Sequence, residues 1–266
     1  AFELQQLGLT EYQSQLLLSP NHRLIDAAIQ WLQQSPHRYF IRCVDETYPD
    51  LLRQIKQPPL ALFVEGNLQL LSQPQLAIVG SRQPTATGKQ IAFQFAADLC
   101  RQGLTITSGL ARGIDAAAHQ GALSVQGNTI AVLGHGLSHV YPKQHQALTA
   151  QIAAEGVLVS EFLPDIEPRA LFFPLRNRIV VGLSLGTLVV EAAEKRKHEV
   201  LVVDHLKCNI EIEKRAPKIK AKIFFILKCS SHVTNNINSD KTSKHETHGG
   251  HDGTFRQTTL PANAMT

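Results

Sequence analysis

The chain has 266 residues, with 26 Lys and Arg against 22 Asp and Glu, and 43% of its residues are hydrophobic. This length and composition are typical of one or two globular domains, and they exclude a wholly disordered chain. No apolar run approaches the roughly 18 residues that a membrane span needs, so an integral membrane protein is excluded. Residues 1–193 hold 13 basic and 14 acidic residues, whereas residues 194–228 hold 10 and 5. The formal charge of +4 therefore comes from a short C-terminal stretch.

The N-terminus and the cysteines indicate a cytoplasmic protein. The first residues, AFELQ, lack the basic start and the apolar run of a signal peptide. The chain does not begin with Met, which indicates processing or a fragment. The four cysteines lie far apart and form no CxxC pair, so we expect reduced thiols rather than disulfides or a zinc site.

In chain order, helices come first and a linker follows. Residues 1–40 predict short helices, of which the clearest begins at an Asn21 cap and carries an apolar stripe at 3.6-residue spacing. From there to about residue 75 the sequence is rich in turn residues, such as those at 48–50 and 58–59, and we expect a linker.

From residue 76 onward, short apolar strands alternate with helices. Strands that are apolar on both faces and separated by helices predict a parallel sheet that is covered on both sides. In such α/β folds, ligands bind at the carboxyl ends of the strands. We expect strands at residues 76–79, 104–107, 129–133, 157–160 and 187–190, and helices at 88–101, 113–123 and 143–154.

The regular pattern ends near residue 194. A lysine-rich segment follows, and from residue 230 onward the chain is polar, so we expect disorder there. The sequence thus predicts a helical segment over residues 1–45, an α/β domain over 46–205, and a divergent tail over 206–266. This tail is basic and then polar, and we expect most of it to be disordered.

Glycine and basic residues gather in the loops after the first three strands. In the first loop, residues 80–82 (GSR), glycine lets the backbone approach a ligand, and Ser and Arg can donate to a phosphate. In the second, residues 108–115 (SGLARGID), Gly113 opens a helix whose N–H groups and dipole favour an anion. The third loop contains residues 134–136 (GHG) and then 141–143 (YPK). In the alternative interpretation, the glycines only form tight turns and the arginines are solvated.

Standard nucleotide-binding fingerprints are absent from these loops. Gly80 and the segment 88–90 differ from a P-loop in glycine spacing, and Gln90 stands where Ser or Thr would coordinate magnesium. No G-x-G-x-x-G motif opens a helix. An ATPase and a dinucleotide-dependent oxidoreductase are therefore disfavoured, and we expect no cofactor and no metal.

A second cluster, residues 172–179 (FFPLRNRI), combines aromatic and basic residues. Arg176 and Arg178 lie beside Asn177 and two phenylalanines, and Arg169 adds a further charge. Such a cluster suits single-stranded nucleic acid, because cations contact the phosphates while aromatic rings stack on the bases. The alternative interpretation is the N-terminus of a helix with buried Phe and ion-paired Arg.

Together these motifs resemble those of the DNA-processing protein A family (DprA, also called Smf). Tyr48-Pro49, residues 80–82, 108–115, 141–142 and 173–179 occur in the family's order and approximate spacing, and the resemblance covers roughly residues 8–193. It implies a Rossmann-like, doubly wound domain with a SAM-like helical segment before it. It also implies a protein without catalysis that binds single-stranded DNA, protects incoming DNA during natural transformation, assists RecA recombinase loading and can form a homodimer.

The loops and the resemblance together select one set of DNA-binding candidates at the carboxyl edge of the sheet. By the family's pattern, residues 80–82 hold DNA phosphate and the others line the same site. The set is Gly80, Ser81, Arg82, Ser108, Gly109, Arg112, Gly113, Lys143, Arg169, Phe173, Pro174, Arg176, Asn177 and Arg178.

The sequence departs from the family after residue 193. Family members usually continue with a Ser-Gly-Ser-Leu-Ile-Thr segment, whereas residues 194–198 here read EKRKH. A frameshift, a chimeric sequence or real divergence could each produce this departure, and a non-functional family remnant is one alternative. In the family, the dimer contacts and the RecA-binding surface lie largely in this later part.

The rival functional hypothesis is an enzyme. Residues 186–191 (GTLVVE) are close to the G-T-x-x-E motif of nucleoside-monophosphate phosphoribohydrolases of related fold, in which a glutamate assists cleavage of the N-glycosidic bond. Here the spacing is one residue too long, and the preceding double glycine is absent. We therefore predict a DNA-binding protein that is not an enzyme.

Two groups of histidines receive simpler interpretations. Asp115 and His119 lie four residues apart on a predicted helix, and we expect a hydrogen bond on the helix surface rather than an acid–base pair. His245, His248 and His251 lie in the polar tail, where we expect a flexible segment rather than a metal site.

Overall fold

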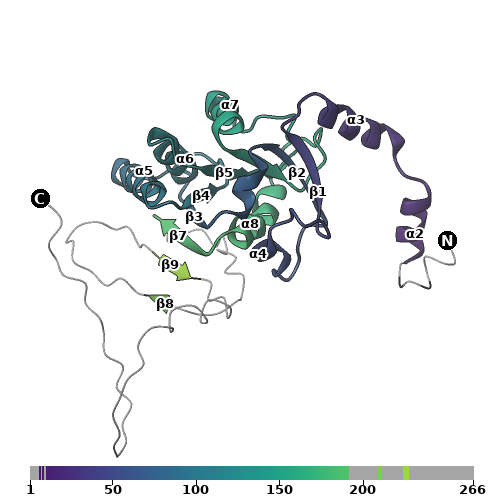
Figure 1. Ribbon diagram of the computed structural model, residues 1–266, viewed down its shortest axis with the longest axis horizontal. Helices are drawn as coiled ribbons and strands as arrows, with labels where there is room; N and C mark the ends of the chain where they lie inside the picture. Colours follow the sequence, from purple (N-terminus) through teal and green to yellow (C-terminus); the bar gives the residue numbers. More distant parts are fainter. Residues whose placement is uncertain (1–5, 7, 9, 192–208, 211–223, 228–266) are drawn as a thin grey trace, which may run out of the picture. The chain divides into compact units, whose positions relative to one another are not determined.

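The computed structural model describes residue 6, residue 8 and residues 10–191, 209–210 and 224–227. Within these residues a mixed sheet has the strand order β1-β2-β6-β5-β4-β3-β7-β9-β8 (Figure 1). The strands are β1 (Arg38–Arg42), β2 (Ala61–Gly66), β3 (Gln75–Gly80), β4 (Thr105–Ser108), β5 (Thr129–Val132), β6 (Val157–Ser160), β7 (Gly186–Val190), β8 (Asn209–Ile210) and β9 (Phe224–Leu227).

The centre of the sheet is parallel, as the sequence predicts. Strand β3 pairs in parallel with β4 and β7, and β5 pairs in parallel with β4 and β6. The carboxyl ends of these five strands therefore meet at one edge of the sheet, which is where an α/β fold binds its ligands.

Helices cover both faces of this parallel centre (Figure 1). Ile78 and Ile106 point to the face covered by α5 (Ala86–Arg101) and α6 (Ile114–Ser124), and α7 (Gln146–Glu155) extends this layer. Ala77 and Ile130 point to the opposite face, where Ile179 of α8 (Phe172–Leu183) packs beside α4 (Asp50–Arg53). This alternation follows from the two-residue period of a strand and confirms the doubly wound α/β class. Short 3₁₀ turns, η1 (Leu68–Ser72) and η2 (Lys143–His145), complete the connections.

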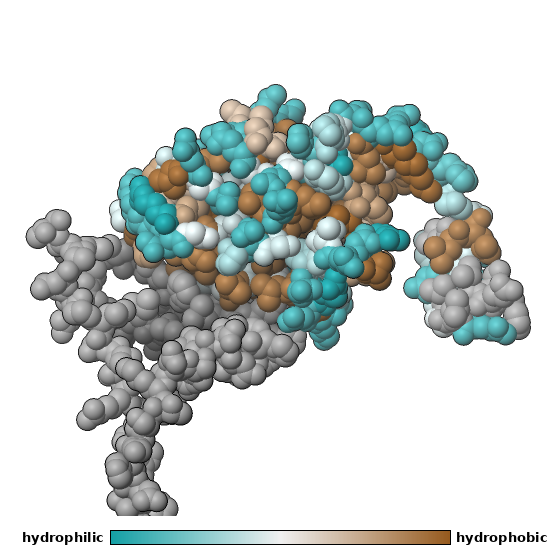
Figure 2. Space-filling model, viewed as in Figure 1, coloured by the Kyte–Doolittle hydropathy of each residue, from teal (hydrophilic) through white to brown (hydrophobic). Residues whose placement is uncertain are grey.

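The N-terminal helices are also confirmed. Helix α2 (Glu11–Leu18) has a Thr10 capping box, and α3 (His22–Gln33) begins at the expected Asn21 cap. Trp31 of α3 contacts the ring of Phe63 edge-on. Figure 2 shows hydrophobic residues gathered on both helices, where side chains such as Leu17 and Ile29 are exposed. None of the helices in the described part of the chain combines the length and hydropathy that a bilayer crossing requires.

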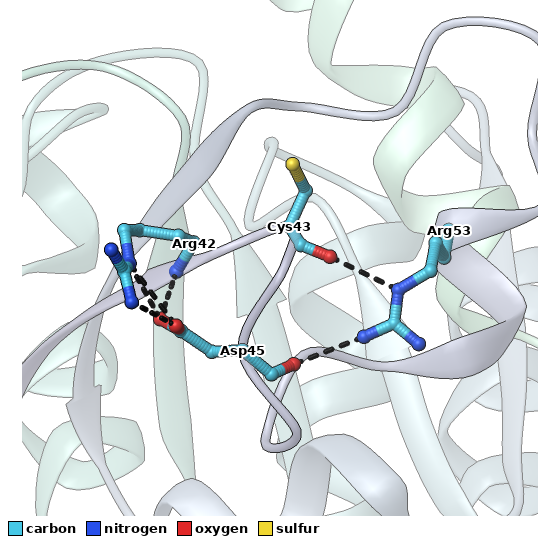
Figure 3. A network of polar contacts seen from close by, with 4 residues as sticks. All are labelled: Arg42, Cys43, Asp45 and Arg53. Atoms are coloured by element: carbon cyan, nitrogen blue, oxygen red, sulfur yellow. Dashed lines mark hydrogen bonds and ion pairs between the residues drawn. The ribbon is translucent and has the colours of Figure 1, made fainter.

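The expectation of a linker before residue 76 is wrong, because β2 lies there, and β1 lies at the end of residues 1–40, where the sequence predicts only helices. Both strands pair antiparallel, β1 with β2 and β2 with β6, so they extend the sheet at one side. Both strands stand among turn residues, and β2 pairs with β6, which is distant in the sequence. The turn after β1 is held by two arginines, with Arg42 donating to the carboxylate of Asp45 and Arg53 donating to the carbonyls of Cys43 and Asp45 (Figure 3). The hydrogen bond from Arg42 lowers the pKa of Asp45.

Most of the predicted tail lies outside the described residues. Of residues 206–266, the structure describes only β8 and β9, and β9 pairs antiparallel with β7. The expected disorder, the three tail histidines and the boundaries at 45 and 205 remain predictions.

The predicted surface pair of Asp115 and His119 is also wrong, because both side chains are buried. The Nδ1 atom of His119 lies 2.7 Å from the hydroxyl of Thr129, and this hydroxyl donates to the carbonyl of Ile106. No partner for Nε2 is found among the described residues. Burial lowers the pKa of His119 to about 3, and the positive charge of Arg176 adds to this effect.

We therefore expect the protein to lose stability as the pH falls. The unfolded chain binds a proton on His119 near pH 6.5 while the folded state resists it down to about pH 3, so the loss begins near pH 6.5. Between pH 7.5 and pH 5 this one group should remove about 2 kcal/mol from the free energy of unfolding. Urea unfolding of the parent and of His119→Gln across this range measures the effect. A parent and a variant with the same pH dependence would contradict it.

Candidate functional site

The loops after β3 and β4 are joined to each other at the carboxyl edge of the sheet. The N–H of Ile114 donates to the carbonyl of Ser81 at 3.1 Å, which ties the start of α6 to the first loop. Gly113 has φ +86°, and a Cβ there would lie 2.3 Å from the same carbonyl oxygen. Only glycine combines this backbone conformation with this close approach. The loop after β3 and the start of α6 are therefore held in one arrangement at this edge.

Arg176 of α8 is the central side chain beneath these loops. It is 3% exposed, and its Nη1 donates to the carbonyls of Gly109 and Val132, which stand at the ends of β4 and β5. A Cβ on Gly109 would lie 2.2 Å from Nη2, so glycine is needed there to admit the guanidinium. Burial lowers the pKa of Arg176 to about 10, and the negative charge of Asp115 opposes this shift. The group therefore stays charged at neutral pH.

Asp115 is the buried counter-charge of this arrangement. Its Oδ2 accepts from the backbone N–H of Gly109 at 3.2 Å and of Ala111 at 3.4 Å. Burial raises the pKa of Asp115, whereas Arg176 and these two N–H groups act in the opposite direction. The carboxylate and the guanidinium thus fix the loop between β4 and α6 from within the fold.

Two further predicted residues also make contacts inside the fold. The hydroxyl of Ser108 is buried and donates to the carbonyl of Ile78 at 2.5 Å. Arg178 forms an ion pair with Glu161 in which both side chains are largely buried. These contacts, and those of Arg176, agree with the alternative interpretation of the FFPLRNRI segment as the start of a helix with ion-paired arginines. Contact of these residues with DNA stays a prediction.

The exposed part of the site is a stack of two rings and a guanidinium. The rings of Tyr141 and Phe173 are stacked with their centroids 5.2 Å apart, and the guanidinium carbon of Arg82 lies 5.6 Å from the Phe173 centroid. Tyr141 is 46% exposed, and Arg82 is also exposed. We call these three residues the stacking surface. It presents an aromatic face, on which an unstacked base can stack, and a cation, which can contact a phosphate.

A second contact between two rings and a guanidinium lies at the start of α8. Phe162 and Phe172 have their ring centroids 4.4 Å apart, and the guanidinium carbon of Arg169 lies 5.9 Å from the Phe172 centroid. Pro174 and Asn177 are exposed on the same helix. Aromatic residues next to cations therefore occur twice along the start of α8.

Arg82 also lines a pocket of about 400 Å³. The lining includes Arg82, Lys89 and Arg112 together with Gln120 and Gln144, and we call it the basic pocket. No Asp or Glu of the described chain is part of its lining. The pocket is therefore positively charged.

Five arginines of the described chain are held in ion pairs. Arg38, Arg42, Arg53, Arg101 and Arg178 each pair with a carboxylate. In contrast, the predicted site residues Arg82, Arg112, Lys143 and Arg169 and the additional Lys89 have no ion pair within the described residues and are exposed, as are Arg23 and Lys56 outside the predicted set. The predicted site residues thus include unpaired positive charge although residues 1–193 are nearly neutral in total.

Glu191, the candidate catalytic residue of the hydrolase hypothesis, supports the first loop instead. Its carboxylate accepts from the N–H of Thr85 at 2.9 Å and from the hydroxyl of Thr85 at 3.1 Å, and Thr85 is the N-cap of α5. Its backbone carbonyl accepts from the N–H of Ser81 at 2.9 Å. Because its carboxylate is engaged at a helix cap, no contact in the described chain favours the hydrolase.

Two residues of this site, Tyr141 and Lys89, lie outside the set predicted from the sequence. The sequence feature that indicates Tyr141 as a site residue is its position two residues before Lys143 in the third strand-end loop. For Lys89 it is the first turn of α5, directly after the loop that carries Arg82.

Residues 39–196 match the family model described as DNA recombination-mediator protein A. The chain is 48% identical over 194 residues to protein Smf of Escherichia coli K12, covering 73% of this chain and 52% of that protein. It is 42% identical over 149 residues to the DNA processing protein DprA of Bacillus subtilis, covering 56% and 50%. The chain thus spans about half the length of these curated relatives.

Two solved structures share the fold. The X-ray structure of DprA from Streptococcus pneumoniae aligns with a TM-score of 0.59 at 39% identity, covering 64% of this chain and 59% of that one. DNA processing protein A from Helicobacter pylori aligns with a TM-score of 0.53 at 32% identity, covering 60% and 71%. The structure from H. pylori is described as showing a unique binding mode for single-stranded DNA.

The burial of Arg176 predicts a large effect on stability. We expect Arg176→Ala to lower the free energy of unfolding by about 3 kcal/mol, because two carbonyls lose their donor and Asp115 keeps a buried charge without its partner. The exposed Arg112→Ala is the matched control and should stay within about 0.5 kcal/mol of the parent. Urea unfolding of all three proteins tests this, and an equal loss in the two variants would contradict the role of Arg176.

Proposed function

The chain belongs to the DNA recombination-mediator protein A family, and we propose that it binds single-stranded DNA at the carboxyl edge of its sheet. In this proposal, bases stack on the stacking surface while the backbone phosphates lie against the exposed cations around it. The bound strand is thereby protected during natural transformation and is made available to RecA recombinase. The proposal includes no catalytic step.

The observation that carries the proposal is the stacking surface itself. A Tyr ring, a Phe ring and an Arg guanidinium in contact, with Tyr141 half exposed, offer a face on which an unpaired base can stack. In a duplex the bases are already stacked on each other, so this surface favours a single strand. The related protein from H. pylori binds single-stranded DNA, which supports this choice of ligand.

Unpaired charge supports the same ligand. The guanidinium of Arg82 lies over the ring of Phe173, and that of Arg169 lies over the ring of Phe172, so each aromatic pair has a cation beside it. Cations without a carboxylate partner keep their full attraction for phosphate, which makes binding dependent on salt. Phosphate contact and base stacking do not distinguish between bases, and binding should therefore tolerate any sequence.

The buried candidates have a supporting role in this proposal. Arg176 and Asp115 hold the loop that contains Gly109, and Ser108 holds the end of β4 against β3. They keep the exposed residues in place without reaching the surface. Arg178, which pairs with Glu161, supports the start of α8 in this proposal.

The proposal also includes recombinase loading and self-association. Both come from the family resemblance, and in the family both surfaces lie largely after residue 193, where this sequence departs from the pattern. We also propose a cytoplasmic location, since RecA and incoming DNA meet in the cytoplasm.

Fluorescence anisotropy with a labelled oligothymidylate tests the proposed function. We expect Tyr141→Leu to weaken binding about tenfold or more, because one base loses its stacking partner while the apolar volume is kept. Arg82→Gln should weaken binding and reduce the slope of log K against log salt by about 0.7, the value for one phosphate contact on a single strand.

The controls match exposure and charge at places away from the site. Phe40 is 45% exposed on β1, so Phe40→Leu is matched to Tyr141→Leu, and the exposed Lys56→Gln is matched to Arg82→Gln. Both controls should bind as the parent does. A parent that does not bind the oligonucleotide, or site variants that bind as well as the controls, would overturn the proposed function.

A further inference from the structure

The basic pocket adjoins the stacking surface, and Arg82 belongs to both. Arg82 therefore connects the stacking surface to the pocket. The pocket volume of about 400 Å³ lies in the range of small-ligand sites, so it has room for a phosphate together with its sugar. Whether the pocket can bind a phosphate depends on the charge of the pocket and on how firmly the residues of the pocket are held.

Three cations line the pocket, and they come from three different segments. Arg82 lies in the loop after β3, Lys89 on the first turn of α5, and Arg112 in the loop before α6. Like charges gathered in one concave site repel each other, and the described chain supplies no carboxylate in the lining to offset them. An anion relieves this repulsion. Gln120 and Gln144, whose side chains carry neutral amide donors, also belong to the lining.

The segments that carry the cations are fixed before any ligand binds. The first loop is joined to the start of α6 by the hydrogen bond from Ile114 to Ser81, and Gly113 packs against the same carbonyl. The start of α5 is capped by Thr85, which is itself bound by Glu191. Fixed donors lose little conformational entropy when an anion arrives, which favours binding.

We propose that the basic pocket is a phosphate subsite that holds, through Lys89 and Arg112, backbone or terminal phosphate of the strand bound on the stacking surface. This inference rests on the proposed function and extends it to a second part of the edge. A phosphodiester carries one negative charge, and a terminal phosphomonoester carries close to two. Three cations suit either two successive phosphodiesters or one terminal phosphate.

The test compares Lys89→Gln, Arg112→Gln and the double variant with the parent in an anisotropy titration of oligothymidylate over a series of salt concentrations. Each single variant should raise Kd several-fold at low salt. The slope of log K against log salt should fall by about 0.7 for each phosphate contact that is lost. Lys56→Gln, an exposed cation outside the pocket, should keep the parent's Kd and slope. Equal melting temperatures show that the variants are folded.

A second arm compares oligonucleotides with a 5′-phosphate and with a 5′-hydroxyl. If the parent prefers the 5′-phosphate and the double variant loses this preference, the pocket holds a strand end. If both oligonucleotides bind alike and the slope still falls in the variants, it holds internal phosphates. Pocket variants that keep the parent's Kd and slope, while Tyr141→Leu weakens binding, overturn the subsite and leave the proposed function standing. A parent that does not bind DNA overturns both.

Discussion

The carboxyl edge of the sheet depends on one buried guanidinium. Arg176 reaches from α8 to the carbonyls that end β4 and β5, and Asp115 approaches the same loop from α6. A buried charge is costly unless it is paired and hydrogen-bonded, so the positions of α6, α8 and the loop between β4 and α6 are coupled. Gly109 is part of this constraint, since a side chain there would occupy the space of the guanidinium. These contacts hold the exposed residues of the site in place.

The structure also explains how a nearly neutral domain can offer a positively charged site. Arginines such as Arg42 and Arg53 are used in local turns, where they bind carboxylates and carbonyls (Figure 3). Others, such as Arg82, form no ion pair within the described residues and lie over an aromatic ring. Local potential depends on where unpaired charges lie, and the total charge of the chain says little about it. The basic stretch after residue 193 therefore has no part in this explanation.

The parallel centre of the sheet could be predicted from the sequence because its strands are short apolar runs between amphipathic helices. The strands β1 and β2 could not, because RYFIR and ALFVEG stand among turn residues and join the sheet through the pairing of β2 with β6, far away in the sequence. For the site, the GSR and YPK loops could be located from glycine and charge alone. Which arginine is exposed could not, since Arg176 and Arg82 are the same residue type and only packing separates them. The burial of His119 was missed for the same reason.

Glu191 brackets the segment that carries Arg82. Its carbonyl holds Ser81 at one end, and its carboxylate holds Thr85 at the other. Both contacts belong to a residue that directly follows β7, far from the Arg82 segment in the sequence. A substitution at Glu191 would therefore act on the position of Arg82 through both ends of its segment, although Glu191 does not touch Arg82 itself.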